Sequence, residues 1–77
     1  MPHITVKLWP GKSEEQKVRL AEQIVKDMIA ITESSETSIS VAIEEVRPED
    51  WTEAVYKPDI LNGSGTLYKK PGYNPLG

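Results

Sequence analysis

One long amphipathic segment between two alternating segments limits the folds open to this sequence. Residues 2–9 and 38–46 alternate polar with apolar side chains and are rich in β-branched residues, which is typical of half-buried strands. Residues 14–32 carry apolar side chains at helical spacing, and Ser13 and Gln16 before them have the positions of a capping box. Strand, helix and strand in this order predict a βαβ unit with parallel strands and a right-handed connection.

The remainder of the chain gives weaker signals. Residues 48–51 read as the first turn of a short helix, because proline is tolerated at the first helical positions. Turn-forming residues dominate 62–65 and 69–73, and a two-stranded sheet leaves its edges open, so we expect the tail to close an edge as a strand or hairpin. The predicted fold class is therefore α/β (α+β): a parallel two-stranded sheet, one long helix, a short C-terminal helix and a closing strand or hairpin, in one domain over residues 1–77.

Length and composition predict self-association. A chain of 77 residues buries only about 60% of the surface that it exposes when unfolded. The sequence has no cysteine and a single histidine, so we expect neither disulfides nor a metal site to stabilise it. A second copy of the chain is the simplest way to add buried surface, and we therefore expect a homo-oligomer.

The charge pattern argues against two classes of partner. There are 9 Lys and Arg residues against 12 Asp and Glu residues, with no basic patch, so we expect no nucleic acid partner. The apolar runs fall far short of the ~20 residues that a membrane span requires, and the N-terminus lacks the features of a secretory signal. These observations predict a cytoplasmic protein without a membrane partner.

Pro2 is the residue with the most unusual chemical potential. The sequence lacks a Cys–His pair, a nucleophile elbow and a phosphate-binding glycine loop. Removal of Met1 would leave Pro2 as an amino-terminal secondary amine. An ordinary α-amino group titrates at about 7.7–8.0, and an apolar pocket or a nearby cation would lower that pKa and leave a neutral base. The simpler interpretation is that Pro2 merely begins a strand.

Several segments resemble one known family. Residues 2–25, PHITVKLWPGKSEEQKVRLAEQIV, are similar to the opening of the 4-oxalocrotonate tautomerase family. Residues 38–43, 48–51 and 69–73 are similar to its dimeric PptA subgroup. The resemblance implies a tautomerase-like fold, a homodimer, and a cofactor-independent isomerase that interconverts the enol and keto forms of a small 2-oxo acid.

The resemblance also implies roles for individual residues. Pro2 matches the general base. Lys12 stands where the founding enzymes have an arginine that binds the substrate carboxylate, and Ser40 where they have a second arginine that polarises the 2-oxo group. Trp51 matches an aromatic residue that walls the pocket. Because Ser40 brings no positive charge, a monocarboxylate with an aromatic or apolar tail, such as phenylenolpyruvate, fits better than a dicarboxylate.

Other interpretations of these residues stay open. Lys12 could be a solvated charge, Ser40 a structural residue of its strand, and Trp51 a packing residue. Arg47 is a second candidate for binding the carboxylate, whereas His3 points away from Pro2 by strand parity and is not expected to be catalytic. Pro2 could instead act as an acid in a hydratase or dehalogenase of the same family, or the protein could be a non-catalytic dimeric interaction module.

Overall fold

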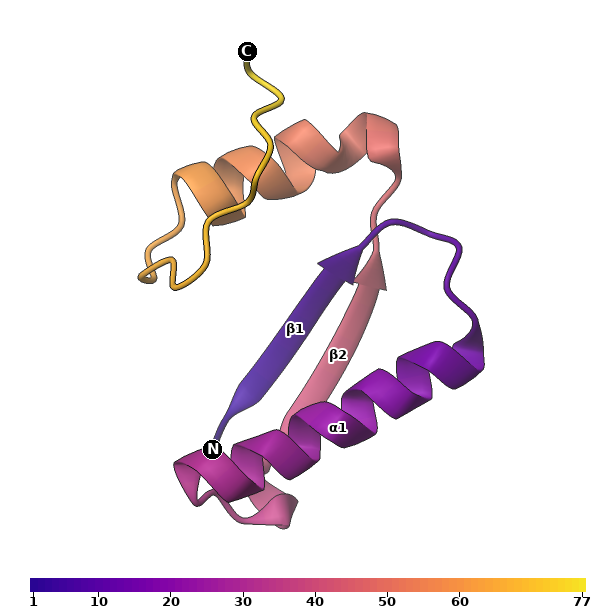
Figure 1. The fold of residues 1–77 in the computed structure, drawn as a ribbon, viewed down its shortest axis with the longest axis vertical. Helices are drawn as coiled ribbons and strands as arrows, with labels where there is room; N and C mark the ends of the chain where they lie inside the picture. The colour runs from indigo at the N-terminus through magenta and orange to yellow at the C-terminus, as the bar shows by residue number, and fades with distance from the viewer. The chain divides into compact units, whose positions relative to one another are not determined.

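The computed structural model describes all residues from Met1 to Gly77. They divide into two compact units, Met1–Glu45 and Val46–Gly77, and each is described by itself. The first unit has the predicted order: strand β1 (His3–Leu8), helix α1 (Glu14–Thr32), a short 3₁₀ turn η1 (Glu36–Ser38) and strand β2 (Ser40–Glu45) (Figure 1). The strand–helix–strand prediction is therefore confirmed.

The two strands pair in parallel as expected, and their register gives the sheet two different faces. His3 lies beside Ser40 at one end and Leu8 beside Glu45 at the other. Because side chains alternate along a strand, one face is mainly apolar, with Glu45 at its end, and the other is mainly polar. The apolar face carries Ile4, Val6, Leu8, Val41 and Ile43, and the polar face carries His3, Thr5, Lys7, Ser40, Ala42 and Glu44.

Helix α1 begins and ends with specific caps. The Ser13 amide donates to Gln16 Oε1 over 2.9 Å, and the Gln16 amide donates to Ser13 Oγ over 3.1 Å, which confirms the capping box. After Thr32 the chain turns at Glu33, which has a left-handed backbone (φ 58°) and donates its amide to the Ile29 carbonyl. These caps explain why the helix has the bounds that the sequence predicted.

The helix lies against the apolar face of the sheet, with most of its contacts on β2. Ala21 faces both Val41 and Ile43, and Val25 and Ile29 line the same shallow groove above Val41. At the other end of the groove, Lys17 Nζ lies 2.8 Å from Glu45 Oε2. The polar face of the sheet is therefore the one that α1 leaves uncovered.

The second unit, Val46–Gly77, is built around a longer helix than expected. A short 3₁₀ turn η2 (Pro48–Asp50) leads into a π-helix η3 (Thr52–Leu61), in which each amide donates to the carbonyl five residues before it. Val55 and Tyr56 are its buried residues, with exposed fractions of 5% and 7%. Tyr56 packs against Tyr73, with ring centroids 5.7 Å apart.

Two expectations about this part of the chain have different outcomes. The short C-terminal helix is confirmed, although it extends through Leu61. The closing strand or hairpin is not formed in the single chain, where residues 62–77 adopt turns and irregular structure. Several glycines and prolines in this stretch favour turns over ladder pairing. The prediction of one domain over residues 1–77 stays a prediction.

Little of the single chain is buried. Val55 and Tyr56 are the only residues in its core, while large apolar side chains such as Trp9, Val18 and Ile31 are exposed. A homo-oligomer would cover such side chains, but it stays a prediction. None of the helices is long and apolar enough to cross a membrane.

Candidate active site at the start of the first strand

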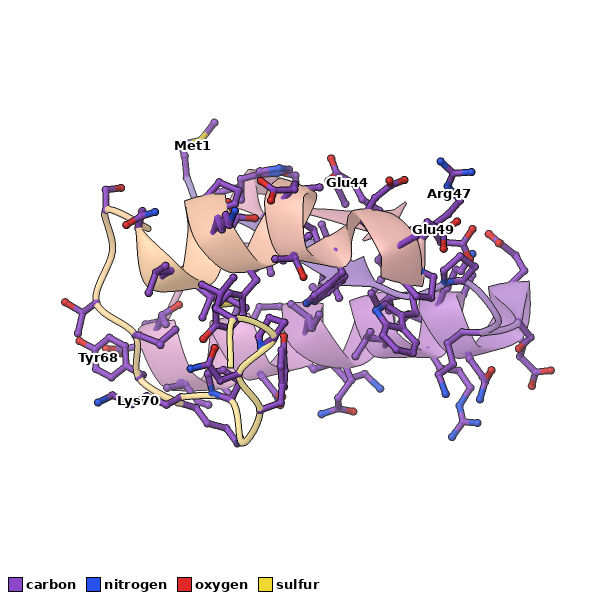
Figure 2. The ribbon with its side chains drawn as sticks, turned by 90° about the horizontal axis from the view of Figure 1, so that it is seen from above. Met1, Glu44, Arg47, Glu49, Tyr68 and Lys70 are labelled. Atoms are coloured by element: carbon purple, nitrogen blue, oxygen red, sulfur yellow. The ribbon has the colours of Figure 1, made fainter.

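Pro2 and Ser40 meet at one end of the sheet. The Ser40 amide donates a hydrogen bond to the Pro2 carbonyl oxygen over 3.1 Å. Pro2 directly precedes His3, the residue that pairs with Ser40 in the sheet. Pro2 is half-buried, and the preceding Met1 is fully exposed, projecting from the structure in Figure 2. The structure thus brings together the predicted general base and one of the predicted substrate-binding residues.

The Ser40 side chain belongs to a row of polar groups on the polar face of the sheet. Ser40 Oγ lies 2.6 Å from His3 Nδ1, and His3 Nε2 lies 3.2 Å from Thr5 Oγ1. The sequence showed that His3 and Ser40 point to the polar faces of their strands. It did not show that they are neighbours, because that depends on the register between the strands. Knowledge of the register, in which His3 pairs with Ser40, would have been needed to predict this contact.

Lys12 lies at the other end of β1. The loop that contains it follows the strand, with Gly11 in a left-handed conformation (φ 124°), and the Lys12 side chain is exposed. Figure 1 shows this loop leaving the end of β1 opposite to the N-terminus. A rise of about 3.3 Å per residue separates the two ends of the strand by roughly 20 Å. A single chain therefore does not bring Lys12 to Pro2.

Trp51 lies in the second unit, where it has a packing role. Its indole Nε1 donates to Tyr73 Oη over 2.8 Å, and the indole is half-buried. Because the Tyr73 ring also packs at a tilt against the buried Tyr56, this bond ties the irregular tail to the start of η3. Trp51 therefore packs within its own unit, as one of the two interpretations of this residue predicted. Its role in lining a pocket stays a prediction.

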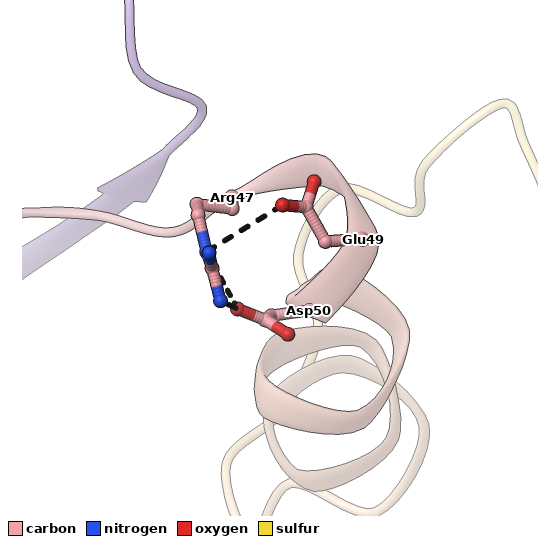
Figure 3. Close-up of polar contacts among 3 residues, drawn as sticks. All are labelled: Arg47, Glu49 and Asp50. Carbon is pink, nitrogen blue, oxygen red and sulfur yellow. Dashed lines mark hydrogen bonds and ion pairs between the residues drawn. The ribbon is translucent and has the colours of Figure 1, made fainter.

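Arg47 is already paired with carboxylates. Its Nε and Nη2 donate to Asp50 Oδ2 over 3.1 and 3.0 Å, and Glu49 Oε1 lies 3.5 Å from Nε (Figure 3). Two negative charges thus surround one guanidinium, so the cluster as a whole repels a further anion. This arrangement argues against Arg47 as the residue that binds a substrate carboxylate.

Comparison with known proteins decides the family. The sequence model of one family, described as Tautomerase enzyme, matches residues 2–55. The chain belongs to the tautomerase family. This confirms the resemblance seen in the sequence, and it makes the protein a tautomerase, an isomerase that acts on a small molecule.

Individual relatives of this tautomerase match nearly its whole length. It is 40% identical over 76 residues to a probable tautomerase of Xylella fastidiosa (strain 9a5c), covering 99% of this chain and 93% of that protein. It is 45% identical over 75 residues to Tautomerase PptA of Pectobacterium atrosepticum, covering 96% and 99%. Among solved structures, YwhB, a homologue of 4-oxalocrotonate tautomerase, superimposes with a TM-score of 0.59 at 41% identity, covering 60% of this chain and 75% of that one. The tautomerase-like fold class is thereby confirmed.

Proposed function

We propose that this tautomerase interconverts the enol and keto forms of a 2-oxo acid such as phenylenolpyruvate, with amino-terminal Pro2 as the general base. The hydrogen bond from the Ser40 amide to the Pro2 carbonyl is the observation that carries the proposal. It fixes the first residues of β1 beside a side chain that can donate to a substrate oxygen. The full exposure of Met1 supports its removal, which the mechanism requires because a Pro2 nitrogen in an amide bond cannot accept a proton.

The proposed reaction is a 1,3-proton transfer. The neutral Pro2 nitrogen takes the proton of the enol hydroxyl, and the O–H electron pair forms the C2=O bond. The C2=C3 electron pair then takes a proton from the prolinium at C3, which returns the base to its neutral form. Atoms and electrons balance within substrate and amine, so no cofactor is needed. A positioned base of this kind contributes on the order of 10²–10⁴ in rate.

Two side chains are proposed to bind the substrate. The Ser40 hydroxyl donates to the 2-oxo oxygen as negative charge develops there, and such a donor contributes on the order of 10²–10³ in rate. Lys12 binds the carboxylate. Because Lys12 lies at the far end of β1 from Pro2, we propose that a second copy of the chain supplies it and that the active form is a cytoplasmic homodimer.

The substrate class follows from what the site lacks. Ser40 is neutral and offers no cation to a second substrate carboxylate, and the Arg47 guanidinium is already paired with Asp50 and Glu49. A monocarboxylate with an aromatic or apolar tail is therefore favoured. Trp51 is proposed as the aromatic contact for that tail, on the strength of its sequence position.

The decisive experiment measures the intact mass of the purified protein and its ketonisation activity on the same sample. We expect Met1 to be absent from the purified protein and phenylenolpyruvate to be ketonised. Pro2→Ala should lower kcat by at least about 10²-fold. Adding one residue before Pro2 should abolish activity without changing any side chain, because it converts the amine to an amide. Ser35→Ala is the matched control, since this serine makes no capping hydrogen bond.

Two results would overturn the proposal. Undiminished ketonisation by the extended protein would show that the Pro2 nitrogen is not the base. A protein that lacks Met1 yet converts no enol acid would favour the non-catalytic interaction module. The pH profile separates the remaining alternative, because a base loses activity below the Pro2 pKa, whereas the acid of a hydratase or dehalogenase loses it above.

A further inference from the structure

The polar face of the sheet in Met1–Glu45 carries a hydrogen-bonded row of three side chains, and the proposed reaction uses only Ser40 at one end of it. The row runs from Thr5 Oγ1 to His3 Nε2 over 3.2 Å, and from His3 Nδ1 to Ser40 Oγ over 2.6 Å. Both ring nitrogens of His3 therefore have a hydroxyl partner. The strand register holds these groups in line, because His3 and Ser40 lie side by side and Thr5 is the next residue on the same face.

We propose that His3 is a positioning residue that decides whether the Ser40 hydroxyl can donate a hydrogen bond to the substrate. The inference rests on the proposed role of Ser40 as the donor to the 2-oxo oxygen. His3 itself touches neither substrate nor Pro2 nitrogen in this scheme. It acts through the hydroxyl that it holds.

The argument follows from counting protons. A hydroxyl has one proton to donate, and a neutral imidazole has one N–H donor and one acceptor nitrogen. With the proton on Nε2, His3 donates to Thr5, and Ser40 must give its only proton to Nδ1. With the proton on Nδ1, His3 donates to Ser40 Oγ, Thr5 donates to Nε2, and the Ser40 proton is available for the substrate.

Substrate charge favours the second arrangement. In that arrangement Nδ1–H points to Ser40 Oγ and the Ser40 hydroxyl points to the substrate oxygen, so consecutive donors polarise one another toward the developing negative charge. A protonated His3 also donates at both nitrogens and leaves the Ser40 proton available. The other charged groups on this face are Lys7 and Glu44, which lie side by side beyond Thr5, and α1 covers the opposite face.

The first test uses the only histidine of the chain as a spectroscopic probe. The ¹⁵N resonances of the imidazole report which nitrogen carries the proton, without overlap from another histidine. Ser40→Ala should shift the Nδ1 resonance and change the tautomer ratio, and Ser35→Ala should leave both unchanged. Saturating phenylpyruvate should move wild-type His3 toward the Nδ1–H form. Imidazole resonances that Ser40→Ala does not move would overturn the inference.

The second test is a double-mutant cycle on kcat/KM for phenylenolpyruvate. If His3 acts only through Ser40, His3→Phe and Ser40→Ala should each cost on the order of 10²-fold, and the double variant should cost no more than either. His3→Asn should recover much of the loss, because its amide N–H can donate to Ser40 Oγ. Losses that multiply in the double variant would show that His3 acts independently and would overturn the inference.

The two proposals fail in different ways. If the wild-type protein ketonises no enol acid, the proposed function falls, while the resonances still decide whether His3 and Ser40 are coupled. If Pro2→Ala abolishes activity but His3→Phe does not lower it, the proposed function stands and the positioning role of His3 is overturned.

Discussion

The Ser40 amide donates to the Pro2 carbonyl oxygen over 3.1 Å, so the two residues are joined through the backbone and not through the serine side chain. A substitution at Ser40 that keeps the amide therefore leaves Pro2 in place. The hydroxyl, by contrast, faces His3 on the polar side of the sheet. The placement of Pro2 and the role of the Ser40 hydroxyl can thus be tested separately.

Ser40→Ala should lower activity without unfolding the protein. The hydroxyl is the proposed donor to the 2-oxo oxygen, and we expect kcat to fall by about 10²-fold. The side chain is exposed, so the free energy of unfolding should change by no more than about 0.5 kcal/mol. Steady-state kinetics and urea unfolding on the same samples measure both. A large loss of stability would mean that Ser40 is mainly a structural residue of β2.

The sequence predicted the first unit well because its signals are local. Strict alternation around Val6 and Val41 determines each strand, and the capping box at Ser13 determines where α1 begins. The length of η3 was not predicted, because Pro58 lies inside it and its apolar residues follow no clear period.

The site was predicted less completely, for a geometric reason. The sequence named Pro2 and Ser40 as candidates, but the contact between Ser40 and His3 depends on the strand register, which neither strand encodes alone. Likewise, the resemblance to the family implied that Lys12 binds the substrate, but it did not show that the length of β1 separates Lys12 from Pro2. Separation along an extended strand is a property of the three-dimensional structure, and for this reason the proposed role of Lys12 involves a second chain.

Ser13→Ala should destabilise the protein by about 1 kcal/mol. The Ser13 hydroxyl accepts from the Gln16 amide over 3.1 Å, and without it a helix-terminal donor loses its protein partner. Urea unfolding followed by far-UV circular dichroism measures the change, with Ser35→Ala as control. A cost equal to that of the control would show that the capping box contributes nothing measurable to α1.

The ion pair of Lys17 with Glu45 should make stability depend on pH in the alkaline range. The hydrogen bond to Glu45, with the negative charges of Glu45 and Glu14, raises the pKa of Lys17 above its ordinary value of 10.5, against a smaller lowering by desolvation. A pKa raised by folding gives stability that is complete below the unfolded value and is lost as pH rises through the folded value.

Lys17→Met should therefore flatten the fall in the urea midpoint between about pH 10 and pH 12. Lys26→Met, at an exposed lysine of the same helix, provides the matched control. Identical slopes for the Lys17 and Lys26 variants would rule out a contribution from the pair.

Lys12 and Arg47 should respond differently to loss of charge. Lys12→Met should raise KM for phenylenolpyruvate about tenfold or more, because the proposed charged hydrogen-bonding partner of the carboxylate is lost. Arg47→Met should leave KM nearly unchanged, since Asp50 and Glu49 already occupy its guanidinium. Steady-state kinetics distinguish the two residues, and a selective rise in KM for the Arg47 variant would reverse their assignment.

A mixing experiment tests whether two chains build one site. Pro2→Ala and Lys12→Ala are each expected to be impaired, and co-refolding them in equal amounts should restore activity. Random pairing makes half of the dimers mixed, and each mixed dimer has one site with both residues intact, so about a quarter of the wild-type activity should return. Pro2→Ala mixed with Ser40→Ala should restore none, because Pro2 and Ser40 lie together in one chain. Equal recovery in both mixtures, or in neither, would contradict a carboxylate site supplied by the second chain.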